Sequence, residues 1–307
     1  MINRRNIRVK VMQVLYAPGV AGAEKSVDLL RKKFEESHQL FLYLLYVLTE
    51  IMRYAEKDAS VRAGKNLPSK EDLEVNIKIS GNDLLWKILE SPSFKTGTEK
   101  FDLYYPATSA MVKKVYRELA ESPIYIDYIK EASRNKPGER DIIKYIFTDL
   151  MLPNDDLVSV VEEYFTNWED DADMMYKLIL NCLQKTGNFS YEAFITSEKL
   201  EFGETLLLTV LEKNIFLKDM ITPKLKNWDV ERIAALDMIL MQMGVAEFLF
   251  FESIPTKVTI NEYIDIAKEY STPQSGHFIN GILDNIHKEL LAEDKIHKVD
   301  FKAKVTR

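Results

Sequence analysis

Apolar side chains recur at helical spacing through most of this chain. Between residues 37 and 62 they repeat at i, i+3, i+4 and i+7, at Phe41, Leu44, Leu45 and Leu48. This spacing places side chains on one face of an α-helix. Similar spacing predicts further helices at residues 82–90, 107–121, 123–133, 139–150, 155–166, 170–185, 202–218, 228–250, 259–270 and 275–291. No segment alternates with the period of two that predicts a strand, so we expect an all-α protein.

Turn chemistry separates these segments. Gly64, Pro68 and Ser80-Gly81 predict a loop at residues 64–80, and prolines mark most later boundaries. Glycine (11) and proline (10) are otherwise scarce in the 307 residues, which favours helices because both residues destabilise helix interiors. Thr259 and Glu262 have the spacing of a helix capping box.

Composition indicates a cytoplasmic protein without a membrane segment. The apolar run that begins at Leu40 ends near Met52 and is interrupted by Glu50, so it falls short of the roughly 20 residues that a bilayer requires. No apolar leader follows the basic N-terminus. Cys182, the single cysteine, can form neither an internal disulfide nor a cysteine zinc site, and we expect it to be a small buried apolar residue.

The sequence offers no motif for catalysis, a cofactor or a metal. Glycine-rich phosphate loops, the zinc motif H-E-x-x-H and the nucleophile elbow are absent, and the four histidines are scattered. The acidic segment 169–173 lacks the glycine and the terminal glutamate of an EF-hand, so we interpret it as acids at a helix N-terminus. We therefore expect a protein that is not an enzyme and has no cofactor.

Charge is unevenly distributed along the chain. The net charge is −7, so nucleic-acid binding would require a local basic patch. Residues 1–13 contain no acid and four bases: Arg4, Arg5, Arg8 and Lys10. On a helix the three arginines fall within about 100° of arc. Positive charge at a helix N-terminus costs a few tenths of a kcal/mol, and no core role suits these arginines, so they are candidate ligand-binding residues.

Two stretches of the sequence resemble the NusB family of transcription antitermination factors. The first is Arg-Arg-Asn-Ile-Arg at residues 4–8, followed by Gln-Val-Leu-Tyr at 13–16. The second begins with Trp-Asp-Val-Glu-Arg-Ile at 228–233 and Ile-Pro-Thr-Lys-Val at 254–258. It continues with Ile-Asn-Glu at 260–262, Ile-Ala-Lys at 266–268 and S-x-x-F-I-N-G-I-L-D at 275–284.

The resemblance implies a NusB-like helical bundle with an all-helical insertion. We expect residues 1–50 and 200–293 to form a discontinuous NusB-like domain, because these regions carry the resemblance. Residues 51–199 then form the helical insertion, and residues 294–307 form a basic, flexible tail.

The resemblance also implies partners. NusB proteins pair with NusE, a small-subunit ribosomal protein, and the pair binds the boxA element of single-stranded RNA within the RNA polymerase antitermination complex, which supports ribosomal RNA transcription. Carried over by position, the RNA-binding residues are Arg4, Arg5, Arg8, Gln13, Tyr16 and Phe278. The partner-binding residues are Gln274, His277 and Phe278.

The sequence departs from the family pattern at both surfaces. Asn6 stands where many members have another arginine, Gln274 where an acid is common, and His277 where a lysine is. Two residues keep two interpretations: Tyr16 is a stacking platform or a half-buried core residue, and Phe278 is a ligand contact or part of its helix's apolar stripe. Asn261, Glu262 and Asn280 are interpreted as cross-links between helices.

Two alternative functions stay open. The chain could be a protein-interaction scaffold that has lost RNA binding, or an accessory domain of an RNA-modifying enzyme, as in NusB-like domains fused to ribosomal RNA methyltransferases. A further hypothesis is a homodimer that buries the predicted N-terminal helix with Arg4, Arg5 and Arg8.

Overall fold

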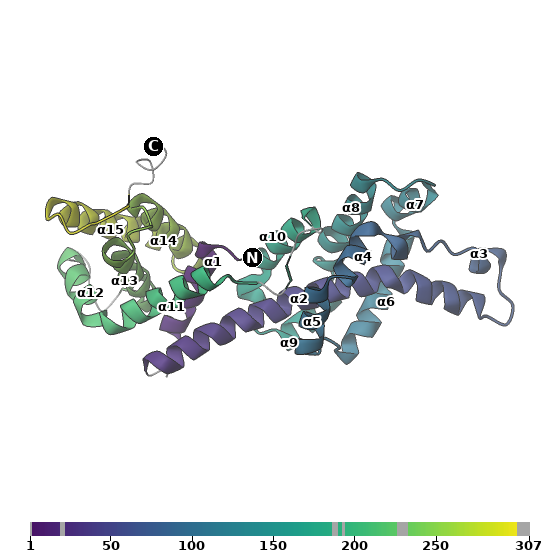
Figure 1. The fold of residues 1–307 in the computed structure, drawn as a ribbon, viewed down its shortest axis with the longest axis horizontal. Coiled ribbons are helices and arrows are strands. Elements are labelled where there is room, and N and C mark those ends of the chain that lie inside the picture. The colour runs from purple at the N-terminus through teal and green to yellow at the C-terminus, as the bar shows by residue number, and fades with distance from the viewer. Residues whose placement is uncertain (1, 19–21, 186–189, 192–193, 226–232, 300–307) are drawn as a thin grey trace. The chain divides into compact units, whose positions relative to one another are not determined.

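The computed structural model describes the chain except residues 1, 19–21, 186–189, 192–193, 226–232 and 300–307, and the regular elements of the described part are all helices (Figure 1). Its longer helices are α1 (Arg4–Tyr16), α2 (Ala23–Ala63), α5 (Pro92–Phe101), α6 (Pro106–Glu121), α8 (Lys136–Tyr145), α9 (Asp155–Tyr164), α10 (Trp168–Gln184), α11 (Ser197–Glu212), α13 (Ala235–Phe250), α14 (Thr256–Tyr270) and α15 (Ser275–Ala292). Shorter segments are α3 (Lys70–Leu73), η1 (Lys78–Gly81), α4 (Asp83–Leu89), α7 (Pro123–Lys130), η2 (Ile146–Met151), α12 (Asn214–Ile221) and η4 (Thr222–Leu225). The all-α prediction is confirmed.

The clearest differences from the sequence-based expectation concern α2, α5 and the α11–α12 region. The helix expected at 37–62 begins at Ala23, and α5 forms where no helix was expected. Pro92 is the first residue of α5, a position that needs no backbone N–H donor. The helix expected at 202–218 ends at Glu212, and α12 begins at Asn214, whose backbone and side-chain oxygens accept hydrogen bonds from Gln242.

The chain divides into two compact units. The central unit contains residues 35–194, and the terminal unit contains residues 2–34 and 195–307, so that α2 carries residues of both. In the terminal unit, α1 packs on α11 and α13, and α13 packs on α14 and α15. Gly203 permits the close approach of α1 and α11, because a Cβ there would lie 2.8 Å from Ile7 Cγ2. The terminal unit thus assembles both ends of the sequence around α13.

Part of the C-terminal tail lies against α13. Lys298 Nζ donates hydrogen bonds of 2.7 Å to the backbone oxygens of Glu247 and Phe251. These are carbonyl groups at the helix C-terminus, where a lysine is favoured by the helix dipole. Burial lowers the pKa of Lys298, while the nearby Glu247 raises it. Residues 294–299, expected to be flexible, therefore make defined contacts, and residues 300–307 lie outside the described residues.

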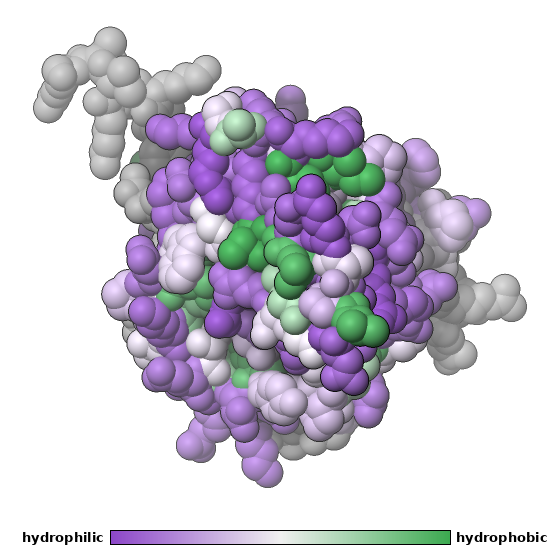
Figure 2. Space-filling model, turned by 90° about the vertical axis from the view of Figure 1, so that its right-hand side faces the viewer, coloured by the Kyte–Doolittle hydropathy of each residue, from purple (hydrophilic) through white to green (hydrophobic). Residues whose placement is uncertain are grey.

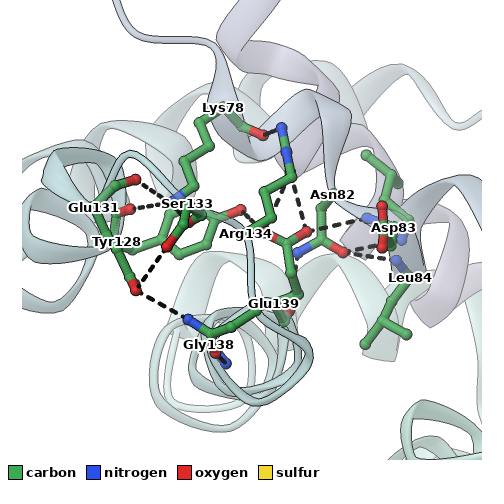
Figure 3. A network of polar contacts seen from close by, with 12 residues as sticks. Lys78, Asn82, Asp83, Leu84, Tyr128, Glu131, Ser133, Arg134, Gly138 and Glu139 are labelled. Carbon is green, nitrogen blue, oxygen red and sulfur yellow. Dashed lines mark hydrogen bonds and ion pairs between the residues drawn. The ribbon is translucent and has the colours of Figure 1, made fainter.

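The central unit contains a buried carboxylate that joins α4, α7 and α8. Glu139 is 2% exposed and accepts hydrogen bonds from Tyr128 Oη (2.8 Å), Arg134 Nη1 (3.1 Å) and the backbone N–H of Asp83 (3.1 Å) (Figure 3). Lys78 Nζ holds the turn between α7 and α8 by donating to three backbone oxygens, those of Tyr128, Glu131 and Ser133. The network fixes short helices that have few turns of their own.

Two expectations about side chains of the central unit are confirmed, those for Cys182 and for the acidic segment 169–173. Cys182 is fully buried, and burial raises the pKa of its thiol to about 11, so it is an inert core residue. Glu169, Asp170 and Asp171 occupy the first turn of α10. Within the described ranges, no cluster of ligand side chains could hold a metal ion. No described helix is long and apolar enough to span a membrane.

Exposed apolar side chains are present in the central unit but scattered. They include Val61, Leu67, Leu73, Ile77 and Ile124. On the face that Figure 2 shows, apolar surface forms separate spots among polar side chains. Isolated exposed apolar residues are normal for folded proteins and need no partner to explain them.

Candidate nucleic-acid interface

Helix α1 begins with a cap that explains Asn6. The Asn3 side chain accepts a hydrogen bond of 2.9 Å from the Asn6 backbone N–H, and the Asn6 side chain accepts one of 3.3 Å from the Asn3 N–H. This reciprocal capping box satisfies two donors at the start of a helix that has no acid in its first turn. At this position an asparagine therefore stabilises the helix start directly.

Arg8 lies in the core of the terminal unit. Its side chain is 2% exposed, and its Nε and Nη2 atoms donate hydrogen bonds of 2.7 and 3.0 Å to the two carboxylate oxygens of Glu247, which is 0% exposed. Burial lowers the pKa of Arg8, but the hydrogen bond and charge of Glu247 outweigh burial and raise it above its ordinary value. The expectation that Arg8 has no core role and faces RNA is therefore corrected. Its guanidinium forms a buried ion pair that joins α1 to α13.

Glu247 is the centre of a wider buried network. Besides Arg8, it accepts hydrogen bonds of 2.8 Å from Tyr263 Oη and from Thr259 Oγ1, both on α14. Burial and the Glu247 charge raise the pKa of Tyr263, which keeps the phenol a donor. The expected capping box at Thr259 is wrong, because α14 begins at Thr256 and Thr259 lies inside the helix, with its hydroxyl on Glu247. Three helices thus share one carboxylate.

Arg4 and Arg5 keep part of their surface exposed. Their side chains are 39% and 37% exposed. Arg4 pairs with Glu198 at 3.1 Å and lies 5.5 Å from the centre of the Phe202 ring. Arg5 pairs with Asp265 at 2.8 Å. Each exposed arginine is therefore bound to an acid of another helix while it still contacts solvent.

Gln13 and Tyr16 lie toward the other end of α1. Gln13 is half-buried, and among the described residues neither atom of its side-chain amide has a hydrogen-bond partner. Tyr16 ends the helix and is 58% exposed, so it is not the half-buried core residue that was one of its two interpretations. At a rise of 1.5 Å per residue, Tyr16 lies about 18 Å along the helix from Arg4.

The turn between α14 and α15 presents the predicted partner residues. Asp237 accepts hydrogen bonds from Ser271 Oγ (2.6 Å) and Ser275 Oγ (2.7 Å), and this ties both ends of the turn to the start of α13. Gln274 and His277 are exposed beside this anchor, while Phe278 is half-buried. The sequence analysis did not identify Asp237 or Glu247, although each is an acid inside an otherwise apolar helix, a pattern that often indicates a buried polar partner.

Comparison with known proteins places this arrangement in a family. Residues 169–288 match the model of the NusB family, and the match includes residues 169–199, which the sequence analysis assigned to the insertion. The transcription antitermination protein NusB of Salinibacter ruber is 40% identical over 98 residues, which are 32% of this chain and 61% of that protein. The chain thus spans less than two thirds of that relative's length.

Two further relatives extend the comparison. A solved structure, T. maritima NusB, is 32% identical and covers 37% of this chain and 80% of that chain, with a TM-score of 0.31. The transcription antitermination protein NusB of Clostridium botulinum is 36% identical over 111 residues, which are 36% of this chain and 84% of that protein. Because the identity extends over most of the Clostridium botulinum protein, this chain belongs to the NusB family.

Proposed function

We propose that this chain is a transcription antitermination factor that acts in the cytoplasm. In this proposal it binds boxA-type single-stranded RNA together with NusE and supports ribosomal RNA transcription as part of the antitermination complex. Family membership supports the proposal, as do relatives named transcription antitermination protein NusB. The role proposed is binding and assembly, without catalysis.

The observation that carries RNA binding is the partial exposure of Arg4 and Arg5 on the first turns of α1. Guanidinium groups suit phosphate because they donate in a planar fork. Tyr16 adds an exposed ring on which an unstacked base can lie. Because Arg8 is buried, α1 offers two arginines to RNA. In a plot of log affinity against log salt concentration, these two arginines should contribute a slope of about −1.4.

The test is fluorescence anisotropy of a labelled boxA-type RNA, titrated with the full chain with and without NusE at several salt concentrations. The double variant Arg4→Ala/Arg5→Ala should weaken binding and flatten the salt slope. Arg31→Ala is the matched control, because Arg31 is an exposed arginine of the same unit that also pairs with a carboxylate, Glu204, at 2.6 Å. Equal losses in both variants would contradict a site on α1.

We further propose that the α14–α15 turn binds NusE through Gln274, His277 and Phe278. The Asp237 anchor supports this, because it fixes the turn that displays these residues. The double variant Gln274→Ala/His277→Ala changes only exposed side chains and should weaken NusE binding in isothermal titration. Asn285→Ala, an exposed change farther along α15, should leave NusE binding unchanged.

One observation favours a second candidate function, a protein-interaction scaffold without RNA binding. Arg4, Arg5 and Arg8 all pair with acids, so the arginine cluster is largely neutralised within the protein. In that case the titration above would show no RNA binding with or without NusE, while NusE binding stayed intact. Sedimentation with and without RNA would test whether a homodimer covers α1.

A further inference from the structure

The central unit has a pocket that the proposed site on α1 does not use. Its volume is about 370 Å³, which lies within the range of small-molecule sites. Helix α2 forms one wall, and the start of α6 with Tyr104, in the loop before it, forms the other. The lining residues used below are Tyr46, Arg53, Tyr54, Lys57, Tyr104 and Ser109. All lie in the described part of the central unit.

Aromatic rings meet at this pocket from two elements. Tyr46 and Tyr54 lie two helical turns apart on one face of α2. Tyr104, in the loop between α5 and α6, is 63% exposed. The Tyr54 ring already packs against Tyr116 at 5.1 Å between ring centres, which supports it from within the unit. The pocket therefore combines a fixed ring with a freely accessible one.

Hydrogen-bond donors accompany the rings. Tyr104 and Ser109 are exposed, Tyr46 is half-buried, and each has a hydroxyl that can donate a hydrogen bond to a ligand. Lys57 forms no ion pair among the described residues, and its Nζ lies 5.6 Å from the centre of the Tyr54 ring. Arg53 donates to Glu50 through Nη1 at 2.9 Å and is 53% exposed. A ligand with a planar ring and an anionic group would satisfy these side chains.

We propose that this pocket binds one nucleotide unit of single-stranded RNA, with the base against the tyrosine rings and the phosphate at Lys57 and Arg53. Stacking on aromatic side chains combined with cations along the backbone is the general mode of single-strand recognition. Half-burial and the neighbouring Glu50 raise the pKa of Tyr46, so its hydroxyl stays protonated and able to donate. Glu50 and Glu56, also in the lining, can accept from a base amino group.

This inference rests on the proposed function for the source of the RNA, and it adds an RNA contact within the central unit. The pocket is tested by locating an RNA crosslink on its own residues, which separates the two proposals.

The first experiment uses the full chain and short 5-iodouridine-containing RNA, with photocrosslinking and mass spectrometry to locate the adduct. We expect a crosslink at Tyr104 or Tyr46, and we expect it to persist in Arg4→Ala/Arg5→Ala. Absence of any adduct on the pocket residues in both proteins would overturn the inference. Persistence of the pocket adduct together with unchanged affinity in the α1 variant would instead overturn the proposed α1 site alone.

The second experiment measures affinity for an RNA that carries single-stranded flanks beside boxA. Tyr104→Ala should weaken binding about 5- to 140-fold, the range for losing one stacked base, while Tyr104→Phe should retain most of the affinity. Tyr176→Ala and Lys87→Ala are matched exposed controls outside the pocket and should have no effect. Weaker NusE binding with unchanged RNA affinity in Tyr104→Ala would overturn the inference and assign the pocket to a protein contact.

Discussion

Each unit contains a buried carboxylate at the centre of a polar network, and the two carboxylates have similar partners. Glu247 in the terminal unit and Glu139 in the central unit both accept from an arginine and a tyrosine hydroxyl. The difference is in the arginine: Arg8 is 2% exposed, whereas Arg134 is 37% exposed. Water can therefore replace the Arg134 guanidinium but has no access to the Arg8 site.

Because of this difference, the same kind of buried carboxylate network stabilises a local turn in one unit and the packing of whole helices in the other. The Glu139 network secures a turn and short helices, so its loss should be local (Figure 3). The Glu247 network joins α1 to α13 and α14, which lie far from α1 in sequence, so its loss should loosen the whole terminal unit. In particular, it holds α1, the helix that carries the proposed RNA-binding arginines.

Replacing Arg8 should have the largest effect. Arg8→Ala leaves the Glu247 charge buried without its cation, and breaking a buried pair in this way costs about 3–5 kcal/mol. Urea unfolding of the full chain, together with hydrogen exchange of peptides from α13 and α14, would locate this loss in the terminal unit. Unchanged exchange in those peptides would contradict the central role of the network.

A compensating change separates the buried charge from the lost contact. In Arg8→Met/Glu247→Leu both charges are replaced by apolar side chains of similar size, a change that is often tolerated. The double variant should therefore regain much of the free energy of unfolding lost in Arg8→Ala. A double variant less stable than Arg8→Ala would contradict this. It would show that the hydrogen bonds from Tyr263 and Thr259 to Glu247 contribute more to the free energy of unfolding than the pairing of the two charges does.

Replacing Arg134 should have a smaller effect. Arg134→Ala removes hydrogen bonds to a charged group, but solvent reaches the vacated position, so we expect a loss of about 1–2 kcal/mol. Hydrogen exchange should increase in α7 and the start of α8, with no change in α14. A loss as large as that of Arg8→Ala would remove the contrast between the two units.

Much of the fold could be predicted from the sequence, because amphipathic helices encode their period locally. The exceptions have identifiable causes. Pro92 was interpreted as a boundary, but proline is equally suited to the first position of a helix, and α5 begins there. No glycine or proline marks the break between α11 and α12, which depends on the contact from Gln242. Such tertiary contacts leave no local trace.

The candidate site was less predictable than the fold. Arg4, Arg5 and Arg8 look equivalent in sequence, but Arg8 meets Glu247, a residue 239 positions away. Which arginine faces the core depends on how α1 is rotated against α13, and the sequence pattern of this short helix does not settle that rotation. Asp237, which anchors the α14–α15 turn, is likewise recognisable only when its serine partners are seen beside it.

Removing an exposed ion pair of α1 should have a smaller effect, and this effect is on RNA affinity. Asp265→Asn removes the closer of the two carboxylates that pair with Arg5, so RNA phosphate competes with one acid fewer. A surface pair of this kind is worth about 0.2–1 kcal/mol, which corresponds to an increase in RNA affinity of up to about fivefold. Asp284→Asn is the matched control, because Asp284 pairs with Lys288 at 2.7 Å on α15. Equal gains in both variants would indicate a general charge effect.

The smallest effect should be a pH dependence of the terminal unit. Burial lowers the pKa of His287, whose ring lies 5.5 Å from that of Phe248. The unfolded chain then binds a proton more readily than the folded one, so the free energy of unfolding should decrease as the pH falls from about 7 through the ordinary histidine pKa of about 6.5. Urea unfolding at pH 7.0 and 5.5 should show this decrease, and His287→Gln should reduce it. If the wild type and the variant lose the same stability, the pH dependence arises from other groups, and the contrast between the units rests on their buried carboxylates alone.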